Sequence, residues 1–242
     1  MSNPIQNDDY TPLAEAKIAI ITTLSKFHQD LGQRAADILY NDDRMNIVEM
    51  PEHPKGVMQC RPAGLTKEHL IKNDMYMPDF AQRFGPDFTE QENPTDQAII
   101  DYEYDGSPSS IVYLAHELGH AIADDIQKEN GKSFKDFTNT QAEQQAYFVQ
   151  SIYSHYTGQA SAESTQAQIV QQDDLNKGEL KVSWERVNQY NYANDQIQNG
   201  ISMGMDERRE LMVKALSETA ETEQNAQPLE TRTHKVSGLE NV

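Results

Sequence analysis

Apolar residues recur at helical spacing along three long stretches of the chain, and these stretches predict most of its secondary structure. Residues 12 to about 40 predict one long helix. The apolar side of this helix would carry Leu13, Ile20, Leu24, Phe27, Leu31, Ala35 and Leu39. A second helix is expected around residues 111–125. Residues 182–216 predict one or two further helices, broken near Gly200 and Gly204.

Shorter patterns fill the region between the first two helical stretches. Apolar runs predict three β-strands, at residues 45–50, 56–61 and 98–104. The first two strands would be joined by a turn at residues 51–55. Residues 65–73 predict a short helix with His69 on its surface, and the proline-containing residues 75–96 predict a long loop that could wall a cleft. Long helices with a few short strands predict an α+β fold that is mainly α.

The composition limits both the size of the core and the choice of partners. Hydrophobic residues make up 37% of the 242 residues, and the mean hydropathy is −0.77, so much of the chain must contact water. We expect a disordered arm at residues 1–11, a single domain at residues 12–216 and a disordered acidic tail at residues 217–242. The net charge of −19 would repel nucleic acids and anionic membranes and would attract a basic or neutral protein partner.

Several features bear on the compartment in which the protein works. The single cysteine, Cys60, excludes an internal disulfide and fits a reducing compartment. Residues 1–12 lack the pattern of a secretory or transit peptide, and no apolar run approaches membrane-spanning length. We therefore expect a cytoplasmic protein, or one secreted into a host cell by a route that needs no signal peptide. The acidic tract at residues 217–223 would suit such a translocation signal.

The strongest chemical signal is the sequence H-E-x-x-H formed by His116, Glu117 and His120. Positions four residues apart share one face of a helix, so both imidazoles can point at a single metal ion. Ser107 and Pro108 supply a capping hydroxyl and a first-turn proline for this helix. Two neutral imidazoles beside a carboxylate are typical of a catalytic zinc site, in which Glu117 would be the general base.

The residues that follow the motif exclude one type of zinc site. A continuing H-x-x-G-x-x-H pattern would need glycine and histidine at the positions that Ala123 and Ile126 occupy. Asp124 and Asp125 lie on the same helix, and we interpret them as a solvated helix end.

The third zinc ligand is expected on a later helix. A turn at residues 129–133, with Gly131 as a helix terminator, separates the two helices. Asn139 or Thr140 can cap the second helix, which carries Glu143. Two helices joined in this way can pack antiparallel and bring Glu143 to the metal ion.

These stretches resemble the catalytic core of a family of zinc peptidases. The sequence SPSSIVYLAHELGHAI after Asp105-Gly106, and TQAEQQAYFVQSIYSHY from Thr140, are similar to the thimet oligopeptidase and oligoendopeptidase F family over about residues 98–157. The resemblance implies a compact zincin-like domain with a small β-sheet beside the HExxH helix. It also implies Zn²⁺ bound by His116, His120 and Glu143. The tyrosine-rich residues 188–193 resemble a family segment whose tyrosine stabilises the oxyanion, which implies that role for Tyr190 or Tyr192.

The chain also departs from this family. Family members are several-fold longer, and they usually have Ser and Glu where this chain has Ala146 and Gln150. The histidine that usually precedes the tyrosines is absent, and His155 is the candidate to replace it. A second resemblance, closer in size, is to compact bacterial effector proteases with an H-E-x-x-H helix.

We therefore expect a monomeric, zinc-dependent endopeptidase of the gluzincin type that hydrolyses a protein or peptide substrate. The strand at residues 98–104 would receive the extended substrate as an added strand. The substrate-binding residues would be Ile99, Ile100, Asp101, Tyr102, Glu103 and Tyr104. The alternative function is a catalytically weak or inactive zinc-binding module for protein interaction, which could be a secreted bacterial effector.

Overall fold

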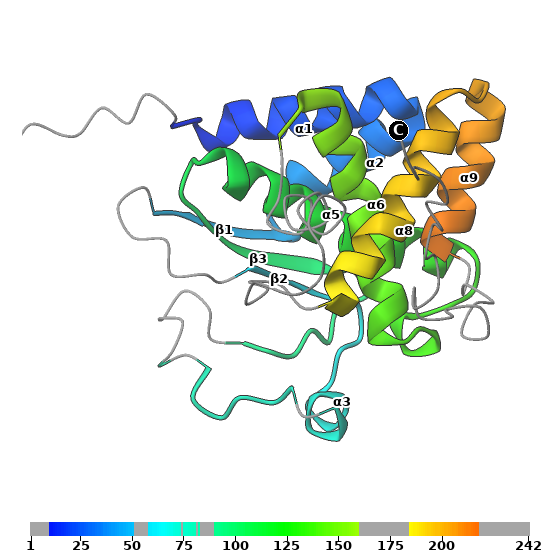
Figure 1. Cartoon of the computed structure of the whole chain (residues 1–242). Coiled ribbons are helices and arrows are strands. Elements are labelled where there is room, and N and C mark those ends of the chain that lie inside the picture. The colour runs from blue at the N-terminus through cyan, green and yellow to red at the C-terminus, as the bar shows by residue number, and fades with distance from the viewer. Residues whose placement is uncertain are drawn as a thin grey trace, which may run out of the picture.

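The computed structural model describes residues 10–50, 58–73, 75–80, 82, 90–159 and 184–217. In these residues the helices are α1 (Leu13–Phe27), α2 (Gln29–Leu39), α3 (Lys67–Lys72), α5 (Pro108–Glu129), α6 (Asn139–Thr157), α8 (Trp184–Ile201) and α9 (Met205–Ser217). A short 3-10 helix, η1, spans Phe134–Asp136, and the strands are β1 (Met45–Glu49), β2 (Met58–Arg61) and β3 (Ile99–Tyr104). The fold is therefore α+β and mainly α, as predicted (Figure 1).

The three strands form one mixed sheet in the order β1-β3-β2. Strand β1 pairs with β3 in parallel, from Met45 opposite Ile100 to Glu49 opposite Tyr104. Strand β2 pairs with β3 antiparallel, from Met58 opposite Tyr102 to Arg61 opposite Ile99. The two strands expected as neighbours are therefore separated by β3. The turn predicted at residues 51–55 lies outside the described residues.

Every second side chain of β3 lies in the hydrophobic core, and these side chains hold the sheet against helix α5. Ile100, Tyr102 and Tyr104 belong to the main hydrophobic core, and the Tyr102 hydroxyl donates a hydrogen bond of 2.6 Å to the carbonyl of Ser110 in the first turn of α5. The intervening Asp101 points to the opposite face, because side chains alternate along a strand. There it accepts hydrogen bonds of 2.6 and 2.9 Å from Arg61 of β2.

The helix predicted for residues 12–40 is two helices, α1 and α2, which pack against each other. The break is at His28, whose backbone is extended (φ −156°, ψ 137°) and whose Nδ1 accepts a hydrogen bond from the Asp30 N–H. The predicted apolar side is still largely correct, because Ile20 and Leu24 of α1 and Leu31 of α2 are fully buried. The break lets both apolar faces reach the same core, which one straight helix could not do.

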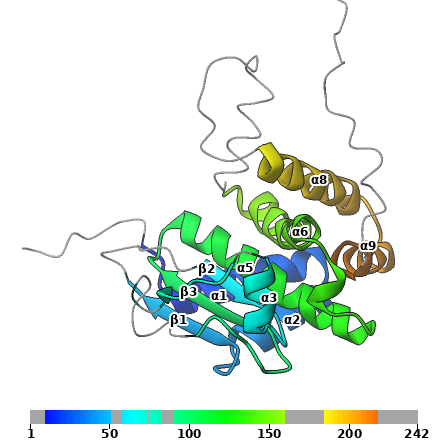
Figure 2. The same ribbon diagram turned by 90° about the horizontal axis from the view of Figure 1, so that it is seen from below.

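Helix α5 is the centre of the molecule. Viewed from below, α6, α8 and α9 lie on one side of α5 and the sheet lies on the other (Figure 2). Gly119 of α5 faces Ala146 of α6 so closely that an added Cβ at Gly119 would lie 2.8 Å from both the Cα and the carbonyl oxygen of Ala146. The glycine therefore allows the backbones of α5 and α6 to meet.

The ends of the described chain differ in part from the prediction. Thr11 was assigned to the disordered arm, but its N–H donates to the Gly106 carbonyl and its own carbonyl accepts from the Tyr104 hydroxyl. The predicted disordered tail begins at Ser217, but this residue is the last one of α9 and is buried. Residues 1–9, residues 160–183 and the rest of the predicted tail, from residue 218, lie outside the described residues. The predicted break near Gly200 and Gly204 is confirmed, since α8 ends at Ile201 and α9 begins at Met205. Within the described residues, no helix is both long and apolar enough to cross a membrane.

Candidate metal centre

Helix α5 begins where its capping residues predict. The Ser107 side chain accepts a hydrogen bond of 3.1 Å from the Ser110 N–H, and Pro108 is the first helical residue. The helix ends at Glu129, and Gly131 follows in the left-handed conformation (φ 70°). Between these ends the helix is uninterrupted, so the expected i, i+4 spacing places His116 and His120 on one face.

Helix α6 brings the third residue to the same place. Its N-cap is Thr138, slightly earlier than the predicted Asn139 or Thr140, because Thr138 and Gln141 form a reciprocal capping box. A carboxylate oxygen of Glu143 lies 3.4 Å from His116 Nε2, and the other lies 3.7 Å from His120 Nε2. One ligand atom from each residue lies within 4.8 Å of the others. This group could bind a metal ion.

The electrostatics of the group suit a metal ion. Burial lowers the pKa of His120 to about 4, against the opposing effect of Glu143, with a smaller contribution from His116 in the same direction as burial. At neutral pH His120 is therefore a neutral imidazole, which is the form that binds metal. Glu117 is 7% exposed and lines the same cleft as the two histidines. Two imidazole nitrogens and a carboxylate are a donor set that fits zinc.

The two tyrosines expected to stabilise the oxyanion lie elsewhere. Tyr190 is buried against Tyr147, with ring centroids 6.1 Å apart, and Tyr192 is 40% exposed on α8. Neither is among the described residues that line the cleft. The physical reason is that α8 packs on α6. The ring of Tyr147 on α6 contacts both His116 and Tyr190, so it lies between Tyr190 and the metal group. His155, the other candidate, is exposed near the end of α6, within 3.4 Å of Gln198.

Two other tyrosines do line the cleft, and sequence reasoning missed both. Tyr113 lies on α5 one turn before His116, and Tyr147 packs its ring against His116 with centroids 4.7 Å apart. Tyr113 shares the helical spacing of the motif, three residues before His116, which is the signal that could have identified it. Tyr147 lies four residues after Glu143 and could have been found by the same criterion.

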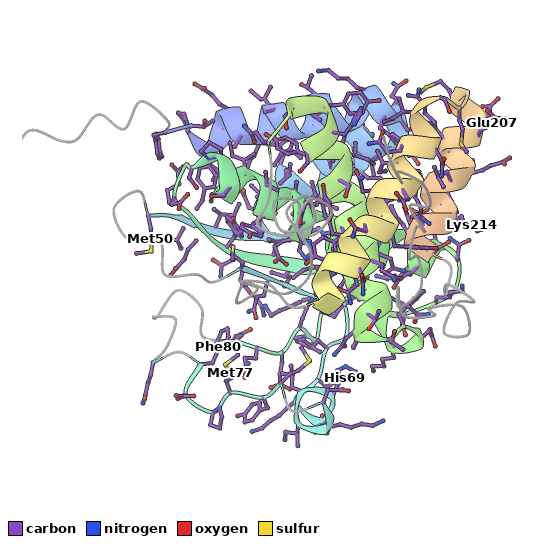
Figure 3. All side chains as sticks on the ribbon, viewed as in Figure 1. Met50, His69, Met77, Phe80, Glu207 and Lys214 are labelled. Atoms are coloured by element: carbon purple, nitrogen blue, oxygen red, sulfur yellow. The ribbon has the colours of Figure 1, made fainter. Side chains whose placement is uncertain are left out.

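The metal group opens into a cleft of about 1020 Å³. Its walls include residues of α5, α6, β2, α3 and the long loop after α3, and Met75, Met77 and Gln91 confirm the prediction that this loop walls a cleft. The α3 segment lies below the sheet, as the labelled His69 and Met77 show (Figure 3). His69 was expected on the surface, but it is half-buried and packs against Phe134 with ring centroids 4.8 Å apart. This contact joins the two walls of the cleft.

The prediction that residues 99–104 receive the substrate as an added strand is wrong. Strand β1 pairs with one edge of β3 from Ile100 to Tyr104, and β2 pairs with the other edge from Ile99 to Tyr102. A substrate strand added along β3 would have to displace one of these two strands. The edge strand beside the metal centre is β2, whose residues from Met58 to Arg61 all line the cleft. Cys60 is among them, and burial raises the pKa of its thiol well above the usual value.

The interpretation of Asp124 and Asp125 as a solvated helix end is also wrong. Asp125 is bound by the Arg44 guanidinium through hydrogen bonds of 2.8 and 3.0 Å. Asp124 is only 4% exposed and lines the cleft. Burial, reinforced by Asp125, raises the pKa of Asp124 to about 6. The sheet and the segment after β2 cover this end of α5, which a local reading of the helix could not reveal.

Comparison with known proteins identifies no relative of this chain. No protein family, no curated protein and no solved structure matches it. The function must therefore be inferred from the residues of the metal centre and its cleft.

Proposed function

We propose that the protein is a zinc-dependent endopeptidase that uses Glu117 as its general base. The observation that carries this proposal is the meeting of His116, His120 and Glu143 within 4.8 Å, beside Glu117, in an open cleft. Two histidines and one carboxylate are the protein ligands of many zinc hydrolases. A zinc ion bound by them would lower the pKa of a water molecule to about 7 and polarise the scissile carbonyl.

The chain's own residues would then move the proton. Glu117 takes the proton from the water that attacks the scissile carbonyl, and it passes this proton to the leaving amine. Its carboxylate is nearly buried, so it would be shielded from bulk water during the transfer. Tyr113 and Tyr147 line the cleft, and one of them would donate a hydrogen bond to the oxyanion, the role that the sequence predicts for Tyr190 or Tyr192.

A peptide fits this cleft as an extended strand along β2. Strand β2 lies at one edge of the described sheet and supplies four consecutive residues to the cleft wall. An added strand would bond to its backbone and pass the metal centre on the way. This arrangement moves the predicted strand-addition site from β3 to its neighbour and keeps the same physical principle.

Two variants test the proposal. Glu117→Gln should keep the zinc content of the wild type and lose most of the cleavage of a proteome-derived peptide library. Glu143→Ala should lose both zinc and cleavage, because two histidines alone hold zinc weakly. Metal content is measured by mass spectrometry after dialysis. A Glu117→Gln protein that cleaves as fast as the wild type would refute the role of the base. A wild-type protein that binds zinc and cleaves nothing would support the interaction module instead.

A further inference from the structure

Asp124 occupies an unusual position in the cleft. It lies four residues after His120, as His120 lies four residues after His116, so the three side chains follow one face of α5. The Asp124 carboxylate is more than nine-tenths buried and lines the cleft. Its Oδ2 has no hydrogen-bond partner among the described residues. Buried polar atoms usually have hydrogen-bond partners, so the unpartnered Oδ2 points to a ligand as its missing partner.

The charges around Asp124 do not neutralise it. Asp125 adds a second negative charge, and the guanidinium of Arg44 is hydrogen-bonded to Asp125 and to the Ala98 carbonyl. Lys128, the Ala63 backbone and Arg44 each lower the pKa of Asp124, but burial is the largest effect and the net pKa is raised. The carboxylate is therefore poorly stabilised without a ligand, and a cation beside it would favour its charged form.

The polar groups beyond Asp124 make this part of the cleft suitable for a polar ligand. Gln127, three residues further along α5, donates a hydrogen bond of 2.8 Å to Gln145 Oε1. Gln145 Nε2 is buried and has no partner within the part of the chain that the structure describes. Both glutamines line the cleft together with Asp124.

We infer that Asp124 binds a cationic group of the substrate, an ammonium or a guanidinium, in the part of the cleft beyond His120. This inference rests on the proposed peptidase function. Its chemistry is a charge-assisted hydrogen bond from a substrate N–H to Oδ2. The cation can be a Lys or Arg side chain, or the free amino terminus of the substrate.

Helix geometry indicates where the cation lies relative to the scissile bond. Four residues of α-helix rise about 6 Å, and an extended peptide advances about 3.3–3.6 Å per residue. The cation should therefore belong to a residue within about two positions of the cleaved bond. The N–H of Ala63, just past the end of β2, hydrogen-bonds to Asp124. A peptide antiparallel to β2, which is the commoner pairing, would place its N-terminal side at Asp124.

The test is a cleavage screen followed by matched peptides. The zinc-loaded full-length protein is given peptides from a proteome digested after glutamate, so that Lys and Arg remain internal. The best-cleaved peptide is then synthesised in three forms: unmodified, with norleucine or citrulline in place of the nearby Lys or Arg, and with an acetylated amino terminus. Each form is assayed with the wild type, Asp124→Asn and the surface control Asp195→Asn, which removes an exposed charge outside the cleft.

If Asp124 binds the cation, the peptides and the variants should differ in cleavage as follows. The wild type should prefer a Lys, an Arg or a free amino terminus on the N-terminal side of the cleaved bond. Asp124→Asn should lower kcat/KM about tenfold or more for the cationic peptide. It should leave the uncharged peptide and the zinc content unchanged, and Asp195→Asn should match the wild type. If the peptide with the neutral side chain loses cleavage, the cation is a Lys or Arg side chain. If the acetylated peptide loses cleavage, the cation is the amino terminus.

Three results would overturn the inference. One is a wild type with no cationic preference, and another is an Asp124→Asn protein that retains the preference. The third is a wild type that cleaves nothing, which removes the proposed function as well and is distinguished by that broader failure. If Asp124→Asn does not fold, the matched peptides with the wild type still decide. Equal cleavage of the charged and neutral forms then contradicts a role for Asp124.

Discussion

Replacing Gly119 with alanine should weaken both the fold and the metal centre. The new Cβ would lie 2.8 Å from the Ala146 backbone and 3.1 Å from Val149 Cβ, whereas ordinary contacts begin at 3.4 Å. Helix α6 would have to retreat by about 0.6 Å, since backbone atoms cannot rotate away as a side chain can. Glu143, on the preceding turn of α6, would move with it.

The magnitudes can be estimated from these distances. Overpacking of this kind costs about 1–3 kcal/mol, whereas alanine in place of glycine in a helix contributes about 1 kcal/mol of stabilisation. The net loss of stability should therefore lie between about 0 and 2 kcal/mol. Metal–ligand distances tolerate deviations of only about 0.2 Å, so zinc affinity should fall about 10–100-fold.

Two assays measure these effects. Urea unfolding of the metal-free protein gives the stability, and competition with a chromophoric chelator gives the zinc affinity. Gly204→Ala, in the turn between α8 and α9, is the control for a methyl group added without a clash, because an added Cβ there meets nothing closer than 3.5 Å. A Gly119→Ala protein that is as stable as the wild type and binds zinc equally well would refute the idea that this contact positions Glu143.

Three further predictions concern single side chains. Asp124→Asn should stabilise the metal-free protein at pH 8 by at most about 3 kcal/mol. The pKa of about 6 in the folded protein exceeds the ordinary value of 3.8, so the stability of the wild type falls as pH rises through this window. The advantage of the variant should therefore vanish below about pH 4, which urea unfolding at a series of pH values measures. Tyr102→Phe removes the hydrogen bond to Ser110 and should cost about 1 kcal/mol in urea unfolding without changing zinc content; an unchanged unfolding midpoint would contradict the estimate. Tyr113→Phe should lower kcat for the best-cleaved peptide, because it removes a hydroxyl that would contact the oxyanion, whereas Tyr192→Phe should behave as the wild type. The reverse pattern would favour Tyr192 as the residue that stabilises the oxyanion.

The parts of the site that follow from local spacing could be predicted from the sequence. His116 and His120 meet because four residues make about one helical turn, and Ser107 and Gly131 mark the helix ends through their own backbone and side-chain preferences. The third candidate ligand, Glu143, depends on a second helix of similar regularity that is joined by a short turn. Each of these features is determined by residues close together in the chain.

The features that sequence reasoning missed depend on distant packing. Strand β3 lies between β1 and β2 because of pairings with residues about 40–55 positions away, so its edges could not be judged from its own pattern. Asp124 looks like a solvated charge on α5 until the segment after β2 covers it. The break at His28 reflects the same limit, because the apolar spacing continues on both sides and only the common core requires two helices.

The central claim is that His116, His120 and Glu143 together hold one zinc ion. A crystal structure of the zinc-loaded protein, with anomalous data collected on both sides of the zinc absorption edge, tests this most directly. If the three residues hold zinc, the map will contain one strong zinc peak about 2.0–2.2 Å from a nitrogen of each histidine and an oxygen of Glu143. A zinc peak elsewhere in the molecule, or a Glu143 carboxylate turned away from an ion bound by the histidines, would contradict it.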